Sequence, residues 1–332
     1  MPASVELLTN HLLSGALSII CALWLDQLLG EPRRFHPLVG FGRLSRLIEI
    51  KLRLSPREKS HQYNSDSVAK YNRRNGALAW FLAVTPPVMF TWLISTLLSS
   101  SFPLINFIFS TIILYLTIGG RSLTEHAHHI YVPLKSGDMT GARFAVSMIV
   151  SRNTEKMGEK EIASSAIESV LENGNDAVFA PMFWFVIFGA PGAVLLRLAN
   201  TLDAMWGYKN EKYRHFGFFS AKLDDLLGWV PARITALAYA FTGDFKQALT
   251  CWKTQAKDCA SPNGGVVMTS GAGALRIKIG GPTYYDGVLH DKKPMGIGVE
   301  AFPEAIDRAN NLVKRSSFGL SYLWLVCVIG LM

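Results

Sequence analysis

Long apolar runs separated by polar stretches dominate the pattern of positions along this chain. A helix of about 20 largely apolar residues crosses the hydrocarbon core of a bilayer. Four runs have this character: 12–29, 77–98, 103–118 and 318–332. Pro86-Pro87 predicts a kink in the second of them. The pattern therefore predicts an all-α integral membrane protein with about four transmembrane helices and helical cytoplasmic parts, forming one membrane-embedded domain over 1–332.

A fifth apolar run, 178–199, leaves two alternatives open. It is long enough to span, but the sequence Gly-Ala-Pro-Gly at 189–192 divides it into two pieces of about ten residues, each too short to cross. If the run crossed, Lys209 and Lys222 would lie outside the cell, against the positive-inside tendency. We favour a re-entrant hairpin, which avoids that conflict and whose backbone must be buried in protein at membrane depth.

Composition and charge agree with a membrane protein and indicate its orientation. The chain is 49% hydrophobic and 17% charged, below the ~25% of soluble domains. Between residues 31 and 76 there are eleven Lys and Arg against four Asp and Glu, so this stretch carries +7 of the net charge of +8. Such an excess beside a membrane helix indicates a cytoplasmic loop rather than a nucleic-acid-binding patch. We therefore expect 31–76, 121–175 and 200–316 to be cytoplasmic, with helix breaks at Pro133 and at 136–138.

One cytoplasmic segment has an amphipathic pattern with two explanations. From Phe41 to Leu52 apolar residues recur at helical spacing, and Arg43, Arg46 and Lys51 lie between them. A basic helix of this kind can lie on an anionic inner leaflet, which would make the lipid bilayer a partner. The same pattern also suits a helix packed on the protein's own cytoplasmic part, and the sequence does not separate the two.

Acidic residues continue to the edge of the fifth apolar run. In a helix over 161–173, Glu168 and Glu172 lie one turn apart on the face that also carries Glu161. Most acidic faces are simply solvated, and like charges four residues apart destabilise a helix. This face, however, leads through Asp176 into a buried apolar segment, so its end cannot be fully hydrated. Paired carboxylates in such a place suit Mg²⁺, which bridges protein carboxylates and nucleotide phosphates.

Other polar stretches could bind anions. Asp203 could bind a metal or take a proton, and Lys209 and Arg214 could hold a phosphate, although this stretch taken alone favours a helix–loop–helix with interfacial aromatics. The glycines at 261–265 and 280–281 would let backbone N–H groups approach an anion, but ordinary turns also use glycine and neither common nucleotide-binding motif is present.

Asp26, near the end of the first membrane helix, has two explanations of its own. An acidic residue in such a place is a functional hypothesis by default. The alternative is that its carboxylate caps the start of the loop that follows.

Six sequence blocks follow one another along nearly the whole chain. They read LDQLLGEPRRFHPLVGFG, AIESVLENGNDAVFAPMFW, NTLDAMWGYKNEKYRHFG, LDDLLGWVPARITAL, SPNGG and IGGPTYYDG. Together they resemble the adenosylcobinamide-phosphate synthase family of membrane enzymes in cobalamin biosynthesis. One block alone would be weak, but six in order are specific. The chain departs from the family's pattern at Asn153, where an Asp is usual, and the resemblance leaves the effect of that change open.

The resemblance implies a ligase that uses ATP and Mg²⁺. A propionate of adenosylcobyric acid would be activated, as an acyl phosphate, and attacked by the amine of (R)-1-aminopropan-2-ol or its phosphate, giving adenosylcobinamide or its phosphate. The expected location is the bacterial inner membrane, with several passes and the active site on the cytoplasmic side. The expected partners are the corrinoid, aminopropanol phosphate, ATP, the bilayer and other membrane enzymes of nucleotide-loop assembly, with no nucleic acid.

The residues expected to carry this chemistry come mainly from the six blocks. Those expected to be catalytic are Glu168, Glu172, Asp176, Asp203, Asp224 and Asp225, with Glu168, Glu172 and Asp176 as metal ligands. Those expected to bind substrates are Asp26, His36, Arg152, Trp184, Lys209, Asn210, Arg214, Trp229, Arg233 and Asn263. Trp206 and Tyr208 would join the other aromatics in covering the corrin. A non-enzymatic membrane sensor or regulator on the same scaffold is the alternative, and the intact acids favour the enzyme.

Overall fold

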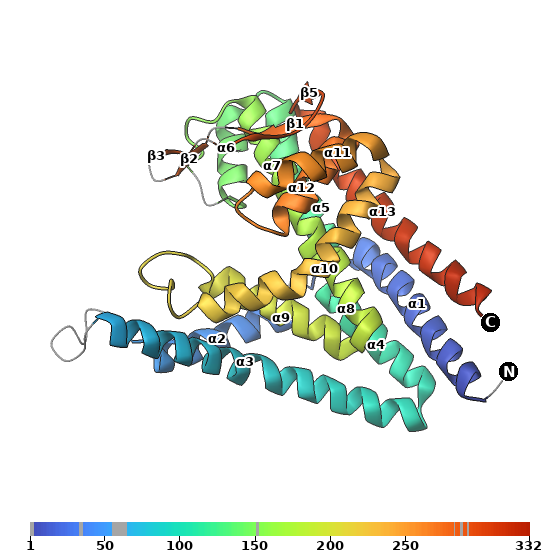
Figure 1. Ribbon diagram of the computed structural model, residues 1–332. Helices are drawn as coiled ribbons and strands as arrows, with labels where there is room; N and C mark the ends of the chain where they lie inside the picture. Colours follow the sequence, from blue (N-terminus) through green and yellow to red (C-terminus); the bar gives the residue numbers. More distant parts are fainter. Residues whose placement is uncertain are drawn as a thin grey trace. The chain divides into compact units, whose positions relative to one another are not determined.

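The computed structural model of the protein is helical along most of its length (Figure 1). It describes residues 3–32, 36–54, 65–150, 153–281, 283–285, 288–290 and 292–332. The chain forms two compact units. Unit 1 consists of Met1–Gly30, Ile118–Ala180 and Trp229–Met332, and unit 2 consists of Glu31–Thr117 and Pro181–Gly228.

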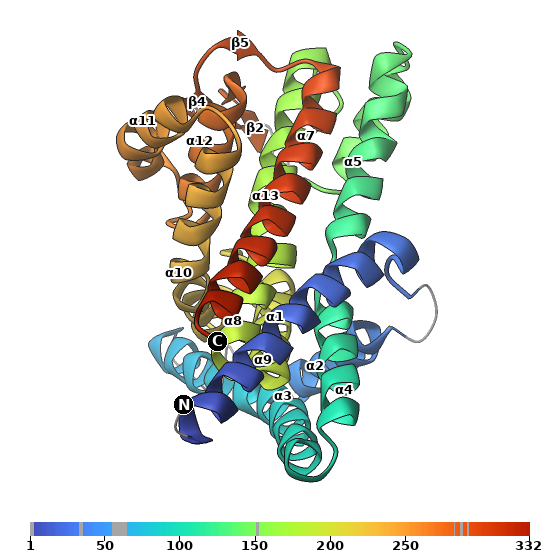
Figure 2. The same cartoon turned by 90° about the vertical axis from the view of Figure 1, so that its right-hand side faces the viewer.

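Unit 1 is built around a helical bundle. In it α13 (Pro303–Gly330) packs on α1 (Ala3–Leu29), α5 (Gly120–Lys135) and α7 (Glu159–Gly174). The helices α1 and α13 run side by side (Figure 1, Figure 2). Ile162, Ile167 and Leu171 of α7 are fully buried, so this helix is the centre of the bundle. The unit also contains α6 (Met139–Ser147), η1 (Asn175–Phe179), part of α10 (Phe218–Thr242), α11 (Phe245–Gln255), η2 (Ala256–Asp258) and α12 (Gly264–Leu275).

A small sheet that the sequence did not predict packs on α7. Its central strand, β1 (Ile277–Gly280), pairs antiparallel with β4 (Pro294–Gly296) and parallel with β5 (Val299–Glu300). A second pair, β2 (Thr283–Tyr285) with β3 (Val288–His290), is antiparallel. Alternate residues of a strand point to opposite faces, so Ile277 and Ile279 are buried while Lys278 is exposed.

Unit 2 is a helical assembly around α9 (Ala190–Trp206). This helix packs on α2 (Pro37–Leu52), α3 (Ser65–Ser101) and α4 (Pro103–Thr117). Only Phe102 separates α3 from α4, and α3 continues through Pro86-Pro87 as one helix. The short apolar α8 (Ala180–Phe188) precedes α9.

The predicted membrane helices are confirmed. Within the part of the chain that the structure describes, four helical stretches are long and apolar enough to cross a membrane: Thr9–Leu29, Asp66–Ser101, Pro103–Lys135 and Pro303–Gly330. The first three contain the predicted runs 12–29, 77–98 and 103–118, and Pro303–Gly330 covers the run 318–332 except for its last two residues. The protein is therefore an all-α integral membrane protein with small additional strands.

The fifth apolar run is interrupted where its sequence predicts. Gly189 has φ +65°, which L side chains rarely adopt, and it separates the nine-residue α8 from the 17-residue α9. Neither piece is among the helices long enough to cross. The break in the helix is thus confirmed, and the re-entrant path of the segment through a membrane stays a prediction.

Two local predictions have different outcomes at α5. The break at 136–138 is present, since α5 ends at Lys135 and α6 begins at Met139. The break at Pro133 is wrong, because α5 continues through this proline. Ile130 and Leu134, on either side of it, are buried, and their packing holds the last turn despite the hydrogen bond that proline cannot donate.

Candidate active site

The acidic helix α7 contacts most of the predicted site residues of unit 1. Glu161 is exposed, and its carboxylate accepts a hydrogen bond from the backbone N–H of Gly158 at 3.0 Å, so it caps the start of α7. Glu168 is only 6% exposed, whereas Glu172 is half-buried. The acidic stripe therefore divides into one solvated capping residue and two carboxylates removed from bulk water.

Glu168 is connected to the glycine turn after β1. The Ser164 hydroxyl donates to Glu168 Oε1 at 3.0 Å, and the backbone N–H of Gly280 donates to Ser164 Oγ at 2.7 Å. Gly280 and Gly281 have φ angles of +79° and +98°, so the turn needs glycine at both positions. Ser164 therefore connects the sequence block around Gly280 to the acidic block by hydrogen bonds. The sequence pattern did not indicate a role for Ser164.

Glu172 lies against the first residue of α12. A methyl group built on Gly264 would lie 3.0 Å from Glu172 Cδ and closer still to Oε1, so the carboxylate occupies the space that a side chain would fill. Ser261 Oγ accepts hydrogen bonds from the backbone N–H groups of Asn263 and Gly264 at 3.3 and 2.9 Å. A carboxylate is favourable at a helix N-terminus, where the helix dipole is positive.

The 261–265 turn is also held from α10. Arg233 donates to Asn263 Oδ1 at 2.7 Å and to the carbonyl oxygen of Pro262 at 3.1 Å. Its guanidinium lies 4.5 Å from the centroid of the Trp229 ring, an arrangement typical of a cation–π contact. Burial lowers the pKa of Arg233, which nevertheless stays cationic near neutral pH. Arg233 and Asn263, both predicted as substrate ligands, are therefore direct neighbours.

The third acid, Asp176, lies in the π-helical turn η1. Such insertions into helices occur frequently at functional sites. Asn175 donates to Asp176 Oδ1 at 2.8 Å and accepts from the Thr235 hydroxyl at 2.8 Å. Tyr239 donates to the carbonyl oxygen of Leu171 at 3.1 Å. Burial, with a contribution from the charge of Asp176, raises the pKa of Tyr239 well above its usual value, so the phenol stays protonated.

Asp26 caps a helix, as one of the two explanations suggested, but the helix is α5 and not the loop that follows Asp26. Its side chain, 1% exposed, accepts from the backbone N–H of Arg121 at 2.9 Å and so caps the start of α5 instead of its own loop. A methyl group on Gly120 would lie 2.9 Å from Asp26 Oδ2 and 3.4 Å from a methyl of Val178 in η1. The first sequence block therefore also meets the π turn, and a role for Asp26 in substrate binding stays a prediction.

The other predicted residues belong to unit 2, which the structure defines separately from unit 1. Trp184 Nε1 donates to the carbonyl oxygen of Leu227 at 3.0 Å, and the Trp184 ring stacks on Phe188. His36 Nδ1 accepts from the backbone N–H of Leu38 at 3.2 Å, so this side chain caps α2. The remaining predicted residues of this unit are Asp203, on α9, Asp224 and Asp225, half-buried on α10, and Lys209, Asn210 and Arg214, exposed between the two helices.

Two predictions near the site have separate outcomes. Trp206 is fully buried and cannot cover a corrin, so that prediction is wrong, whereas Tyr208 is 54% exposed. Arg152 lies outside the described residues. Asn153, where the family usually has Asp, is exposed, and its Oδ1 accepts from the backbone N–H of Glu155 at 2.9 Å, a local turn that Asp would also form.

The described residues contain no group of three or more His, Cys, Asp or Glu side chains placed to hold a metal ion. A complete protein cage made by Glu168, Glu172 and Asp176 is therefore not formed. Mg²⁺ usually binds to one or two carboxylates and completes its shell with substrate phosphates and water. The half-buried Glu172 and Asp176 fit that requirement, and their role as ligands stays a prediction.

Fold and site together define an α-helical membrane protein whose buried carboxylates meet glycine-rich turns in one unit. The chain belongs to the CobD/Cbib family, since the family model described as "CobD/Cbib protein" matches residues 19–313. It is similar to the cobalamin biosynthesis protein CobD of Chromobacterium violaceum, at 45% identity over 320 residues and 96% of each chain. It is also similar to the protein of that name from Stutzerimonas stutzeri, at 46% identity over 301 residues, which are 91% of this chain and 94% of the relative. A probable cobalamin biosynthesis protein CobD of Pyrococcus furiosus is 40% identical over 229 residues, 68% of this chain and 72% of the relative. No solved structure matches the chain significantly.

Proposed function

We propose that this protein is a cobalamin-biosynthesis enzyme that joins (R)-1-aminopropan-2-ol, or its phosphate, to a propionate of adenosylcobyric acid in an ATP-dependent amide ligation. Membership of the CobD/Cbib family and the names of its relatives support the pathway. The observation that carries the proposal for the chemistry is a convergence in unit 1. Five of the six sequence blocks that carry the family resemblance meet around α7 and η1. The block with Glu168 and Glu172 is joined there by Asp26, Thr235, Gly264 and Gly280, one from each of the other four blocks.

The reaction needs an activated carboxyl group, because a carboxylate is a poor electrophile at neutral pH. The γ-phosphoryl group of ATP passes to a propionate oxygen, giving ADP and an acyl phosphate. The amine nitrogen then attacks the acyl carbon, the C–O bond to phosphate breaks, and the amide forms with release of inorganic phosphate. The attacking nitrogen gives up its proton to the departing phosphate as the amide forms, so this step needs no further base.

The chain's own residues bind and orient the nucleotide in this scheme. Glu172 and Asp176 would hold Mg²⁺ together with the nucleotide phosphates, and the metal when bound would offset the phosphate charge. Arg233, fixed by Asn263, keeps the 261–265 turn against Glu172. The buried Glu168 fixes the second glycine turn through Ser164, so both turns keep their backbone shape when substrates bind and leave.

Exposed side chains suited to the other two substrates are also present in the described part of the chain. Lys209 and Arg214 are exposed cations five residues apart, and together they can neutralise the dianion of aminopropanol phosphate. Tyr208 and Trp229 are both more than half exposed and offer flat apolar surface to the corrin ring.

The inner membrane is the proposed location, with the basic loop and the active site on the cytoplasmic side. The helix α2 supports this placement because its faces are reversed relative to a helix of a soluble protein. Phe41, Ser45 and Glu49 are buried, while Leu47 and Ile50 are 59% and 67% exposed. Apolar side chains turned outward beside basic ones suit the surface of an anionic leaflet. A fluorophore on a cysteine at position 47 should be quenched by spin-labelled lipid head groups in nanodiscs, and the absence of quenching would contradict the placement.

Isotope transfer tests the proposed chemistry. Adenosylcobyric acid carrying ¹⁸O in its reacting carboxylate should pass one ¹⁸O to the inorganic phosphate released during turnover, because the propionate oxygen leaves with the phosphate. Unlabelled phosphate, or release of AMP and pyrophosphate, would show that the carboxyl group is activated in another way.

A further inference from the structure

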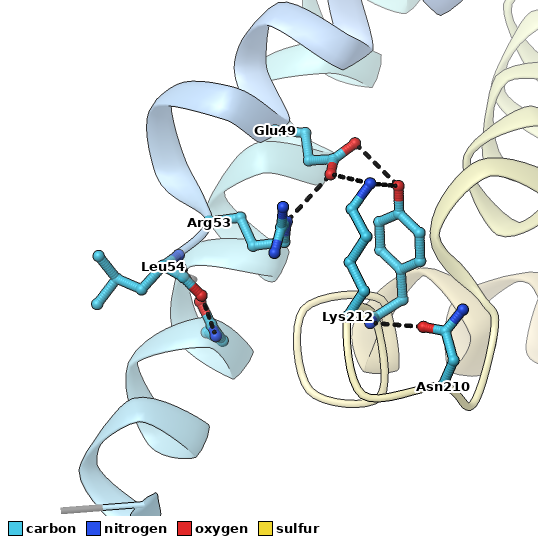
Figure 3. Close-up of polar contacts among 7 residues, drawn as sticks. Glu49, Arg53, Leu54, Asn210 and Lys212 are labelled. Carbon is cyan, nitrogen blue, oxygen red and sulfur yellow. Dashed lines mark hydrogen bonds and ion pairs between the residues drawn. The ribbon is translucent and has the colours of Figure 1, made fainter. Parts of the chain in front are cut away.

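A buried carboxylate in unit 2 connects α2 to the segment that follows α9. Glu49, 5% exposed, forms ion pairs through Oε1 with Arg53 Nε at 3.0 Å and Lys212 Nζ at 3.2 Å. Its Oε2 accepts from the Tyr213 hydroxyl at 3.3 Å, and Lys212 in turn donates to that hydroxyl oxygen at 2.5 Å. Figure 3 shows Glu49 pointing from α2 toward Lys212, with Arg53 beside it.

The α2 side of this connection is fixed independently of Glu49. Asn72 of α3 accepts from the backbone N–H of Leu54 and donates to its carbonyl oxygen, at 2.9 and 3.1 Å. Asn75 donates to the carbonyl oxygen of Leu52 at 2.9 Å. Both amides hold the end of α2 on α3, so Glu49 projects from a platform that already has its own anchors.

The other side of the connection is the loop 207–217, which carries predicted substrate ligands. Inside the loop, Asn210 Oδ1 accepts from the backbone N–H of Tyr213 at 3.0 Å, and the Asn210 carbonyl oxygen accepts from the N–H of Arg214 at 2.9 Å. The position of Tyr213 therefore sets the positions of Asn210 and Arg214. At the base of the loop Gly217 lies against the carbonyl group of Trp206, where a side chain would not fit.

The charges of the loop are divided between two tasks. Lys212 is directed to Glu49, and the hydrogen bond from Lys212 to Tyr213, with a contribution from Glu49, raises the pKa of Lys212 and keeps it cationic. Lys209 and Arg214 are exposed. Among the described residues neither Lys209 nor Arg214 forms an ion pair, and the Arg214 guanidinium lies 3.3 Å from His215 Nε2, so both charges stay available to an anion.

We propose that Glu49 is a positioning residue for the phosphorylated aminoalcohol: its carboxylate holds Lys212 and Tyr213 and thereby fixes the loop that presents Lys209, Asn210 and Arg214. This inference rests on the proposed function, in which the loop binds the phosphate. Neutralising the buried Glu49 removes the counter-charge that the half-exposed Lys212 shares with Arg53, so the loop loses its tie to α2 while α2 keeps its contacts with α3.

Kinetics of Glu49→Gln separate positioning from a merely structural role. The KM for aminopropanol phosphate should rise at least tenfold, while kcat and the KM for ATP stay within twofold. The KM for unphosphorylated aminopropanol should change little, because it has no dianion for the loop to bind. Equal losses with all substrates would overturn the proposal. Asn75→Ala is the matched control, since it removes a buried contact of α2 that does not reach the loop, and it should leave the KM ratio unchanged.

Hydrogen exchange of the purified full chain tests the inference apart from the catalytic assay. In Glu49→Gln, amides of 207–217 should exchange at least tenfold faster, while those of α2 and α3 exchange as in the wild type. Unchanged exchange in the loop would overturn the inference even if turnover fell. If the wild-type protein forms no amide, it is the proposed function that fails. If the loop of Glu49→Gln exchanges faster but the variant binds aminopropanol phosphate as tightly as the wild type, the positioning role of Glu49 is overturned. If Glu49→Gln folds poorly, Tyr213→Phe replaces it as the test, because it removes only one hydroxyl from the same cluster. It should change the exchange of the loop amides and the KM for aminopropanol phosphate in the same directions.

Discussion

Gly264→Ala displaces one carboxylate of the candidate site without changing any charge. The added methyl group would lie 3.0 Å from Glu172 Cδ, whereas carbon atoms pack at about 3.5–4.0 Å, so the carboxyl group must retreat by about 0.5–1 Å. Glu172 is half-buried at the end of a flexible side chain, so it can move without unfolding α7. Gly264 does not have a positive φ angle, so its backbone conformation also accommodates alanine. The variant should therefore fold.

Gly264→Ala should lower the catalytic activity although it leaves the stability of the fold nearly unchanged. Misplacing a catalytic or metal-binding group by about 1 Å can cost about 10²-fold in rate. We expect kcat to fall by about 10- to 100-fold, equivalent to about 1.4–2.7 kcal/mol, and the Mg²⁺ concentration for half-maximal rate to rise. Steady-state assays at varied Mg²⁺ measure both quantities. The control is Gly319→Ala, where no atom lies within 4 Å of the added methyl group. Wild-type kcat and Mg²⁺ dependence in Gly264→Ala would refute the assigned role of Glu172.

Four further predictions follow from the same contacts. Glu172→Gln keeps the shape of the side chain but removes its charge, and it should lower turnover at least ~10²-fold in a folded protein; near-normal turnover would make this carboxylate a structural group. Tyr239→Phe removes the donor to the Leu171 carbonyl and should lower stability by about 1 kcal/mol in thermal unfolding, with no loss meaning that water replaces it. Burial and the charge of Asp258 raise the pKa of Cys259. In a variant with the other cysteines replaced by alanine, the pH of half-maximal maleimide labelling should therefore be higher for Cys259 than for free cysteine, and an equal or lower pH would contradict this. A cysteine at Lys222 should resist an impermeant reagent added to intact cells, and labelling from outside would contradict a cytoplasmic 200–316.

Membrane segments were predictable because hydrocarbon imposes a simple condition on sequence. A spanning helix must be long and apolar, and four runs met that condition. The break at Gly189 was predictable for a local reason, since glycine and proline within the sequence Gly-Ala-Pro-Gly interrupt a helix. The continuation of α5 through Pro133 was not, because the buried contacts of Ile130 and Leu134 that hold the turn are tertiary. Strand β1 was also not predictable, because its few residues pair with β4 and β5, which come after the separate β2–β3 pair in the chain.

Site prediction succeeded for residue type and failed for partners. Helical spacing was sufficient to place Glu168 and Glu172 on one face, and the glycines at 264 and 280 were noticed as possible close approaches. Their proximity to the two carboxylates depends on the packing of α12 and β1 against α7, which no local pattern encodes. Glu49 was missed because one acid in a strongly basic loop resembles a solvated surface charge. Only the fold shows it buried beneath Lys212.

The most direct test of the central claim is amide formation by the purified protein. Adenosylcobyric acid, aminopropanol phosphate, ATP and Mg²⁺ are incubated with it, and the products are analysed by mass spectrometry alongside reactions that each omit one component. We predict a new corrinoid with the mass of the two organic substrates joined with loss of water, formed with one ADP per amide and only in the complete mixture. A complete mixture that yields no such corrinoid, while a purified relative such as the Chromobacterium violaceum protein yields it under the same conditions, would contradict the account.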